Sequence, residues 1–194
     1  MATASEHVMH EVVLIRHGAT EWSRNGRHTG STDLPLLPEG EAEASALRER
    51  LGARTFALVL VSPLQRARET ARLAGVADGA EIDPALHEWD YGDYEGRTTA
   101  DIRTERPGWT VWSGGCPNGE EVEQVGVRAD AIIERVLSAD GDVALVSHGQ
   151  FLRVLIARWL EQAPVEGSRY ALHTATLTVL GYERDTRVLQ QLNA

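Results

Sequence analysis

The stretch that decides the fold is EVVLIRHG, residues 11–18. Its apolar part, 11–15, is rich in β-branched residues and predicts a short buried strand. Arg16, His17 and Gly18 then lie at the carboxyl end of that strand. A permanently charged arginine beside a histidine and a small glycine suits the handling of a phosphate group. A histidine at a strand end is also a common packing or capping residue, so the tripeptide needs support from the rest of the chain.

The same pattern of an apolar run followed by polar groups recurs twice. Residues 56–61 (FALVLV) predict a second buried strand, after which Ser62 and Pro63 form the N-cap and first turn of a helix that ends near residue 74. Arg66 lies close to the start of that helix. Residues 142–147 (DVALVS) predict another strand, which leads through His148 into a helix over 151–160.

The remaining elements are weaker or shorter. Further strands are expected at 81–82, 175–182 and 187–192, and further helices at 38–51, 101–105 and 120–138. Residues 20–36 read as a long loop, and 109–118 as an irregular segment rich in Trp, Gly and Pro.

This order of elements predicts the fold class. Continuous apolar strands that alternate with helices favour an α/β fold, a three-layer α/β/α sandwich with a mostly parallel sheet. Ligands of such sheets bind beyond the carboxyl ends of the strands. Arg16, His17, Arg66 and His148 follow three different strands at such ends. We therefore expect these four side chains to converge on one site.

Composition limits the class of protein and of partner. The 194 residues fit one domain over 1–194, with 1–10, including His7 and His10, as a frayed tail. A net charge of -10 argues against nucleic acid or an anionic membrane as the main partner. No apolar stretch approaches the roughly 20 residues that span a bilayer. A single cysteine and an opening segment without signal-peptide features favour a cytoplasmic location.

The four strand-end groups suit phosphoryl transfer, which needs charge neutralisation and in-line attack. Arg16 and Arg66 can clamp a phosphoryl group. Their charges disfavour a protonated imidazole, so His17 is the expected nucleophile and His148 a further phosphate ligand. A proton donor for the leaving group must come from the acidic stretch 88–95. Its four carboxylates cannot be ranked by residue chemistry: Glu88, Asp90, Asp93 and Glu95.

Other kinds of site fit the sequence less well. The histidines are scattered and there is no second cysteine, so a dedicated metal site is not expected. No phosphate-binding or dinucleotide-binding glycine motif is present, and no cofactor is expected. Trp109 and Trp112 either rim a pocket or pack in the core.

Several motifs together resemble the histidine phosphatase superfamily, which includes cofactor-dependent phosphoglycerate mutases and many phosphatases. They are Arg16 to Trp22, Thr29-Gly30 with Asp33 to Leu36, Ser62 to Ala67, Glu88 with Tyr91-Gly92 and Glu95-Gly96, Gly119-Glu120, and Ser147 to Gly149. The resemblance implies a phosphoglycerate mutase-like fold. It implies that His17 is phosphorylated, that Glu88 is the acid/base, and that Arg16, Arg66 and His148 complete the phosphate pocket. It also implies a set of substrate-binding positions: Arg16, Gly18, Ser23, Thr29, Gly30, Arg66, Tyr91, His148 and Gly149.

Departures from the mutase pattern favour the phosphatase branch. Mutases carry an asparagine where Ser23 stands, a lysine near Thr98 and Thr99, and an arginine pair in the following segment. Without these cations the phosphoenzyme is less able to hold an intermediate, so water should accept the phosphoryl group. The stretches around Glu21 and 88–96 look most like a subgroup of acid phosphatases and sedoheptulose bisphosphatases.

The sequence therefore predicts a metal-independent phosphomonoesterase that acts on a small phosphate ester, such as a sugar phosphate. A phosphoglycerate mutase-type phosphotransferase is the alternative, and a non-catalytic phosphate-ester binding protein is a remote one. Relatives are often dimers, which makes a homodimer an expectation, although no stretch identifies an interface. The leaving-group side of the pocket is expected near Trp22, His28, Trp89, Trp109 and Trp112.

Overall fold

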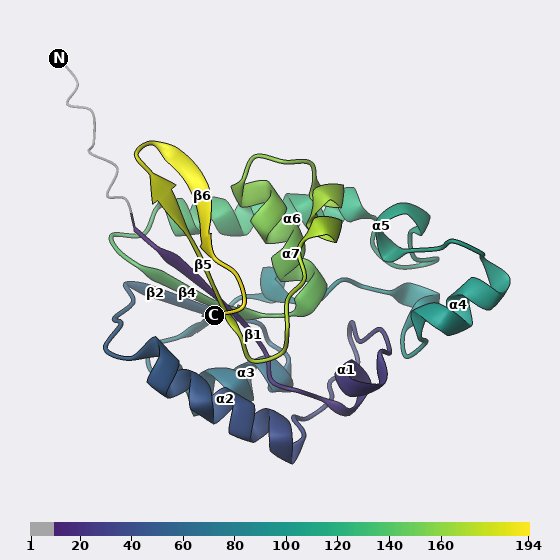
Figure 1. Cartoon of the computed structure of the whole chain (residues 1–194), viewed down its shortest axis with the longest axis horizontal. Helices are drawn as coiled ribbons and strands as arrows, with labels where there is room; N and C mark the ends of the chain where they lie inside the picture. The colour runs from purple at the N-terminus through teal and green to yellow at the C-terminus, as the bar shows by residue number, and fades with distance from the viewer. Residues whose placement is uncertain (1–9) are drawn as a thin grey trace.

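A computed structural model describes residues 10–194, which fold around one six-stranded sheet (Figure 1). The strands are β1 (Val12–Arg16), β2 (Leu58–Val61), β3 (Glu81–Ile82), β4 (Val143–Ser147), β5 (Leu177–Glu183) and β6 (Thr186–Gln191). Their spatial order is β3-β2-β4-β1-β5-β6. The first four in this order are parallel, and β5 and β6 are antiparallel to their neighbours. The mostly parallel sheet predicted from the sequence is confirmed.

Helices cover both faces of the sheet (Figure 1). They are α1 (Glu21–Asn25), α2 (Pro38–Leu51), α3 (Gln65–Ala74), α4 (Thr99–Glu105), α5 (Val111–Gly114), α6 (Val122–Leu137) and α7 (Gly149–Trp159). Helices α2 and α3 lie on one face and α6 and α7 on the other, while α1, α4 and α5 gather beyond the carboxyl ends of the parallel strands. Three short 3₁₀ turns complete the chain: Pro84–Leu86, Gly92–Tyr94 and Pro164–Arg169.

The alternation of side chains along β1 explains the three layers. Val13 and Ile15 belong to the apolar cluster formed with α2 and α3, whereas Val12 and Leu14 belong to the cluster formed with α6 and α7. Successive strand residues point to opposite faces, so a strand buried on both faces must be apolar throughout. All four side chains are at most 1% exposed.

Three local expectations were wrong. Ser62 does not cap α3, which begins at Gln65; the Gln65 N–H donates instead to the Asp33 carboxylate, at 2.8 Å. The predicted loop 20–36 contains α1, capped by Thr20, and the irregular segment 109–118 contains α5.

The expected frayed tail lies mostly outside the described residues, since 1–9 are not described. His10 is buried, with 6% of its surface exposed, so it does not belong to a tail. Within the described chain, no helix combines the length and apolar character needed to cross a membrane.

Candidate active site

His17 lies just beyond β1 and is only 5% exposed. Its Nδ1 lies 2.8 Å from the carbonyl oxygen of Gly18. Since a carbonyl can only accept, Nδ1 carries the hydrogen and Nε2 keeps its lone pair. Burial lowers the pKa of His17 well below its usual value, and the charges of Arg66 and Arg16 lower it further. The ring is therefore a neutral imidazole with a free nucleophilic nitrogen.

Arg16 is one of the cations that line the same pocket as His17. One terminal nitrogen donates to the carbonyl oxygen of Leu172, but the buried Nε has no acceptor within the described chain. A buried donor without a partner is costly, and an anion placed there would satisfy it. Gly149 makes room for this guanidinium, because a Cβ at that position would lie 3.2 Å from Arg16 Cζ.

Arg66 and His148 are brought to His17 but are completely buried behind it. The His148 ring lies 5.1 Å from the His17 ring, centroid to centroid. Arg66 Nε donates to His148 Nδ1 at 3.1 Å, so the other ring nitrogen, Nε2, donates to Ser62 Oγ at 2.7 Å. Both ring nitrogens of His148 are thus bonded to protein groups, which differs from the direct phosphate ligand expected from the sequence.

The remaining donors of Arg66 fasten a loop that borders the pocket. They bind the carbonyl oxygens of Thr29, Gly30 and Thr32 at 2.9 to 3.2 Å. Glu95 holds the same loop from the other side by accepting the N–H groups of Gly30 and Thr32. Glu95 therefore has a structural role, and the position of the loop with Thr29 and Gly30 depends on the buried Arg66 and the half-buried Glu95.

Glu88 is the single carboxylate of the four candidates that lines the pocket with His17. Its Oε1 accepts the N–H groups of Trp89 and Phe151, and its Oε2 accepts that of Gln150, all at 2.8 to 3.0 Å. Each carboxylate oxygen offers about two lone-pair sites, so Oε2 keeps one free. Asp90 instead accepts the N–H of Gly92, and Asp93 accepts from Asn118.

A half-buried ion pair fixes the backbone of the Glu88 loop. Arg128 on α6 binds Glu120 through two nitrogens at 2.8 Å, and both side chains are 16% exposed. Arg128 also donates to the carbonyl oxygens of Ala85 and His87. Burial opposes ionisation of Glu120, but the hydrogen bonds and charge of Arg128 outweigh it and lower the pKa of that carboxyl.

Glu120 also forms hydrogen bonds directly with the loop that carries Glu88. Its carboxylate accepts the N–H of Asp90 at 2.9 Å, and its carbonyl accepts the indole N–H of Trp89 at 2.9 Å. The Arg128 guanidinium also stacks over the ring of Phe151, 4.9 Å from its centroid. The motif residue Glu120 therefore acts on the position of Glu88 and not on the pocket itself. Sequence reasoning missed Arg128, although an arginine within the apolar face of a helix is a usable signal.

The pocket in front of His17 has a volume of about 270 Å³. Seven of the sequence-predicted site residues line it: Arg16, His17, Ser23, Thr29, Glu88, Tyr91 and Gly149. Gly18 does not; it packs on α2, where an added Cβ would lie 2.3 Å from the Gly40 carbonyl oxygen. The Ser23 hydroxyl completes the capping box of α1 by accepting the Thr20 N–H at 2.9 Å. It also donates its hydrogen to the Thr20 carbonyl oxygen at 3.0 Å, which leaves it less suited to donate to phosphate.

The pocket also holds residues that sequence reasoning did not assign to it: Gly26, Arg27, Thr99, Gln150, Arg153 and Leu172. Of the five aromatic positions expected on the leaving-group side, His28 is the one that lines it. Trp109 is 3% exposed and donates its indole N–H to Gly115, so it is a packing residue. Trp112 packs edge-on against Trp89 and beneath Arg153. No group of three or more metal-ligating side chains occurs in the described residues 10–194.

Comparison with known proteins places this geometry in a family. The model of the histidine phosphatase superfamily (branch 1) matches residues 12–194. An acid phosphatase of Mycobacterium tuberculosis is 43% identical over 187 residues, covering 94% of this chain and 92% of that protein. Sedoheptulose 1,7-bisphosphatase of Saccharomyces cerevisiae is 36% identical over 180 residues, covering 76% and 66%. A solved Mycobacterium tuberculosis structure is 42% identical with a TM-score of 0.90, covering 95% of this chain and 97% of that one.

Proposed function

Because the chain belongs to the histidine phosphatase superfamily, we propose that it is a phosphomonoesterase that cleaves small phosphate esters, such as sugar phosphates, through a phosphohistidine on His17 and without a metal ion. The observation that carries this proposal is the state of His17. Its Nδ1–H is held by Gly18, its Nε2 lone pair is free, and Arg16 presents an unsatisfied N–H beside it. A nucleophile and an anion-binding donor thus face one pocket.

In the first step, Nε2 of His17 attacks phosphorus while the bond from phosphorus to the leaving oxygen breaks. Glu88 donates its proton from Oε2, the oxygen with a free lone-pair site, to that leaving oxygen. Arg16 stabilises the equatorial oxygens of the transferring group. The products of this step are a neutral alcohol and a phosphohistidine.

In the second step, Glu88 is ionised and accepts a proton from water at the same oxygen. The hydroxyl oxygen attacks phosphorus, the bond from phosphorus to Nε2 breaks, and inorganic phosphate leaves. Arg66 and His148 assist from behind the pocket: the charge of Arg66 favours neutral His17, and their mutual hydrogen bond fixes both side chains. Burial likewise keeps the pKa of His148 well below its usual value, so it adds no positive charge there.

The test is labelling with ³²P-labelled p-nitrophenyl phosphate, whose leaving group needs no proton, followed by an alkaline SDS quench that preserves phosphohistidine. Wild type should carry an acid-labile, base-stable label, and His17→Ala should carry none. Glu88→Gln should accumulate more label than wild type, because it retains the first step and slows the second. Asp93→Asn, which changes a carboxylate outside the pocket, is the matched control and should behave as wild type. Equal labelling of His17→Ala would sink the proposal. With 3-phosphoglycerate as the substrate, isomerised ester in place of free phosphate would favour the mutase alternative.

Two further expectations accompany the activity. The single cysteine supports a cytoplasmic location, where phosphorylated metabolites are made. The homodimer expected from the resemblance is tested by sedimentation velocity of the purified chain.

A further inference from the structure

Residues 171–176 lead into β5 and border the phosphoryl site. Leu172 lines the pocket, and its carbonyl oxygen accepts a hydrogen bond from a terminal nitrogen of Arg16. The N–H of Ala175 donates to the carbonyl oxygens of Arg16 and His17, at 3.1 and 3.2 Å. The segment 171–176 therefore contacts both the guanidinium that faces the phosphoryl group and the backbone of the nucleophile.

The backbone of this segment has a conformation that needs support from other parts of the chain. Ala175 has a φ of 47°, in the left-handed region that is unfavourable for a residue with a Cβ. Such a residue persists only where the surrounding contacts fix it. Arg50 on α2 supplies one of these contacts by donating to the Ala175 carbonyl oxygen at 3.3 Å.

Asn193, which follows β6, supplies three more contacts. Its Oδ1 accepts the N–H of His173 at 2.9 Å and the hydroxyl of Thr176 at 3.0 Å. Its Nδ2 donates to the carbonyl oxygen of Ala171 at 2.7 Å. One side chain therefore binds the segment on both sides of Leu172, the residue whose carbonyl oxygen holds Arg16.

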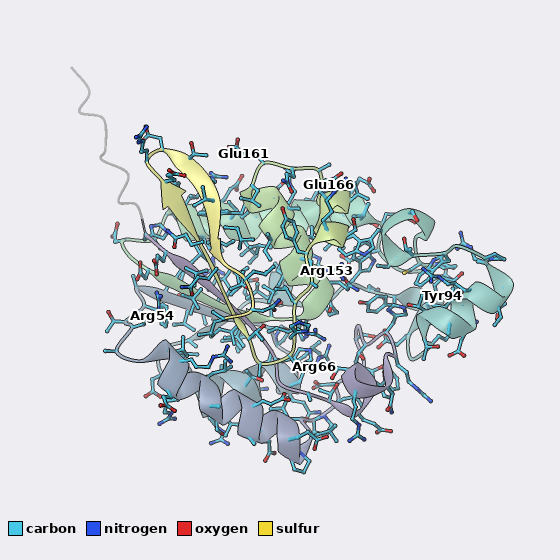
Figure 2. The ribbon with its side chains drawn as sticks, in the orientation of Figure 1. Arg54, Arg66, Tyr94, Arg153, Glu161 and Glu166 are labelled. Carbon is cyan, nitrogen blue, oxygen red and sulfur yellow. The ribbon has the colours of Figure 1, made fainter. Side chains whose placement is uncertain are left out.

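The position of Asn193 is itself fixed by the sheet. Because β6 is antiparallel to β5, and β5 to β1, the carboxyl end of β6 returns to the edge at which β1 ends. Ala194 then exchanges two main-chain hydrogen bonds with Leu177, at 2.8 and 3.1 Å. Figure 2 shows Arg66 at this same end of the sheet, where the chain turns into β5.

Building on the proposed function, we propose that Asn193 is a positioning residue for phosphoryl transfer. By holding the segment 171–176, it fixes the Leu172 carbonyl oxygen that orients the guanidinium of Arg16. The Nε of Arg16 is the buried donor that has no acceptor within the described chain, and hydrogen bonds to an anion depend on direction. A rotated guanidinium would therefore bind the phosphoryl oxygens less well, although Asn193 is not among the residues that line the pocket.

The first test is the affinity for inorganic phosphate, measured by isothermal titration calorimetry, which needs no turnover. Asn193→Gly removes the side chain but tolerates the φ of 57° at this position. We expect the Kd for phosphate to rise by about 10-fold, within the 10²-fold that misplacement of a reacting group by a distant substitution can cost. The kcat/KM for p-nitrophenyl phosphate should fall by a similar factor, and kcat by less.

The matched control is Asn118→Gly. Asn118 has a φ of 59°, and its side chain binds the carboxylate of Asp93 outside the pocket. This variant should keep the wild-type Kd. Because a Kd does not depend on the fraction of folded protein, a loss of stability in Asn193→Gly cannot imitate the effect. Asn193→Asp keeps an acceptor for His173 and Thr176, so it should retain more phosphate affinity than Asn193→Gly.

A double-mutant cycle separates positioning of Arg16 from a general structural role. In an Arg16→Met background, Asn193→Gly should lower kcat/KM by less than 2-fold, because the group through which Asn193 acts is gone. An unchanged Kd in Asn193→Gly, or an equal fall of kcat/KM in both backgrounds, overturns the inference and leaves the proposed function intact. Wild-type protein that binds phosphate but hydrolyses no phosphate ester contradicts the proposed function instead, and the Kd still tests the role of Asn193.

Discussion

Two arginines, the buried Arg66 and the half-buried Arg128, hold the two sides of the pocket, and only one of them is balanced by a carboxylate. Arg66 binds the carbonyl oxygens of the loop 29–32 and the ring of His148. Arg128 binds the carbonyl oxygens of the Glu88 loop and pairs with Glu120. Neither side chain lines the pocket. Both therefore act on backbone position. The charge of Arg66 stays available to the phosphoryl side of the pocket, the part around His17, whereas the charge of Arg128 is neutralised by Glu120.

The presence or absence of a paired carboxylate determines which group's pKa each arginine lowers. Arg66 lies close enough to His17 to contribute to the lowered pKa of that imidazole. Arg128 instead keeps the pKa of Glu120 below its usual value. Arg66 both fixes the backbone of its loop and contributes positive charge near His17, whereas Arg128 only fixes the backbone of its loop. Substitution should separate these two contributions.

The largest effect is expected for Arg66→Met, which removes the loop contacts and the charge together. We expect kcat/KM for all phosphate esters to fall by about 10²- to 10³-fold, the loss that removal of one preorganised charge-stabilising group typically causes. Arg66 lowers the pKa of His17, so its removal raises that pKa and the acid limb of the pH profile moves to higher pH. The measurement is kcat/KM against pH. An acid limb that stays in place would show that Arg66 acts through the loop alone.

A smaller effect is expected for Arg128→Met, which releases the Glu88 loop but leaves the phosphoryl side intact. We expect kcat to fall by about 10- to 100-fold, since misplacement of a general acid loses part of its 10²- to 10⁴-fold contribution. Inhibition by inorganic phosphate should change little. Arg158→Met is the matched control, because Arg158 on α7 pairs with Asp130 on α6 at a more exposed site. Equal loss in both variants would mean that Arg128 contributes only to stability.

The smallest effect concerns stability against pH, to which the buried histidines beside the phosphoryl site should contribute. Burial lowers the pKa of both His17 and His148 below the unfolded value near 6.5. Below that pH the unfolded chain binds more protons, so the free energy of unfolding should fall as pH drops. The slope approaches about 1.4 kcal/mol per pH unit for each histidine.

Urea denaturation between pH 7 and 5.5 measures that slope. His17→Gln should reduce it, whereas His173→Gln, at an exposed position, should not. If His17→Gln keeps the full slope, His17 is not the group whose protonation opposes folding.

Much of the fold could be predicted from local patterns in the sequence. The apolar runs that became β1, β2 and β4 are buried on both faces, and that requirement is visible as an unbroken series of apolar residues. Helix α2 has the predicted bounds, Pro38–Leu51, because a first-turn proline and a following Gly52 mark its ends. The placement of Arg16, His17, Arg66 and His148 near one another follows from parallel strands that end at one edge.

Other features depend on partners distant in sequence, and local patterns do not report them. Ser62 has the composition of an N-cap, but it bonds to His148, 86 positions later. Arg128 and Arg153 look like polar interruptions of helices until the Glu88 loop and Trp112 are packed against them.

The sequence by itself determined the parallel sheet, the neutral nucleophilic role available to His17 and the family to which these motifs point. Spacing and residue type carry that information, because strand burial and strand-end placement are local consequences of the chain. Residue chemistry left four neighbouring carboxylates open and the resemblance pointed to Glu88; the tertiary structure shows that Glu88, of these four, lines the pocket with His17. Only the tertiary structure decided that Arg66 is enclosed and that Asn193 holds the segment 171–176. Those outcomes depend on which hydrogen-bond donors and acceptors meet when distant segments pack together.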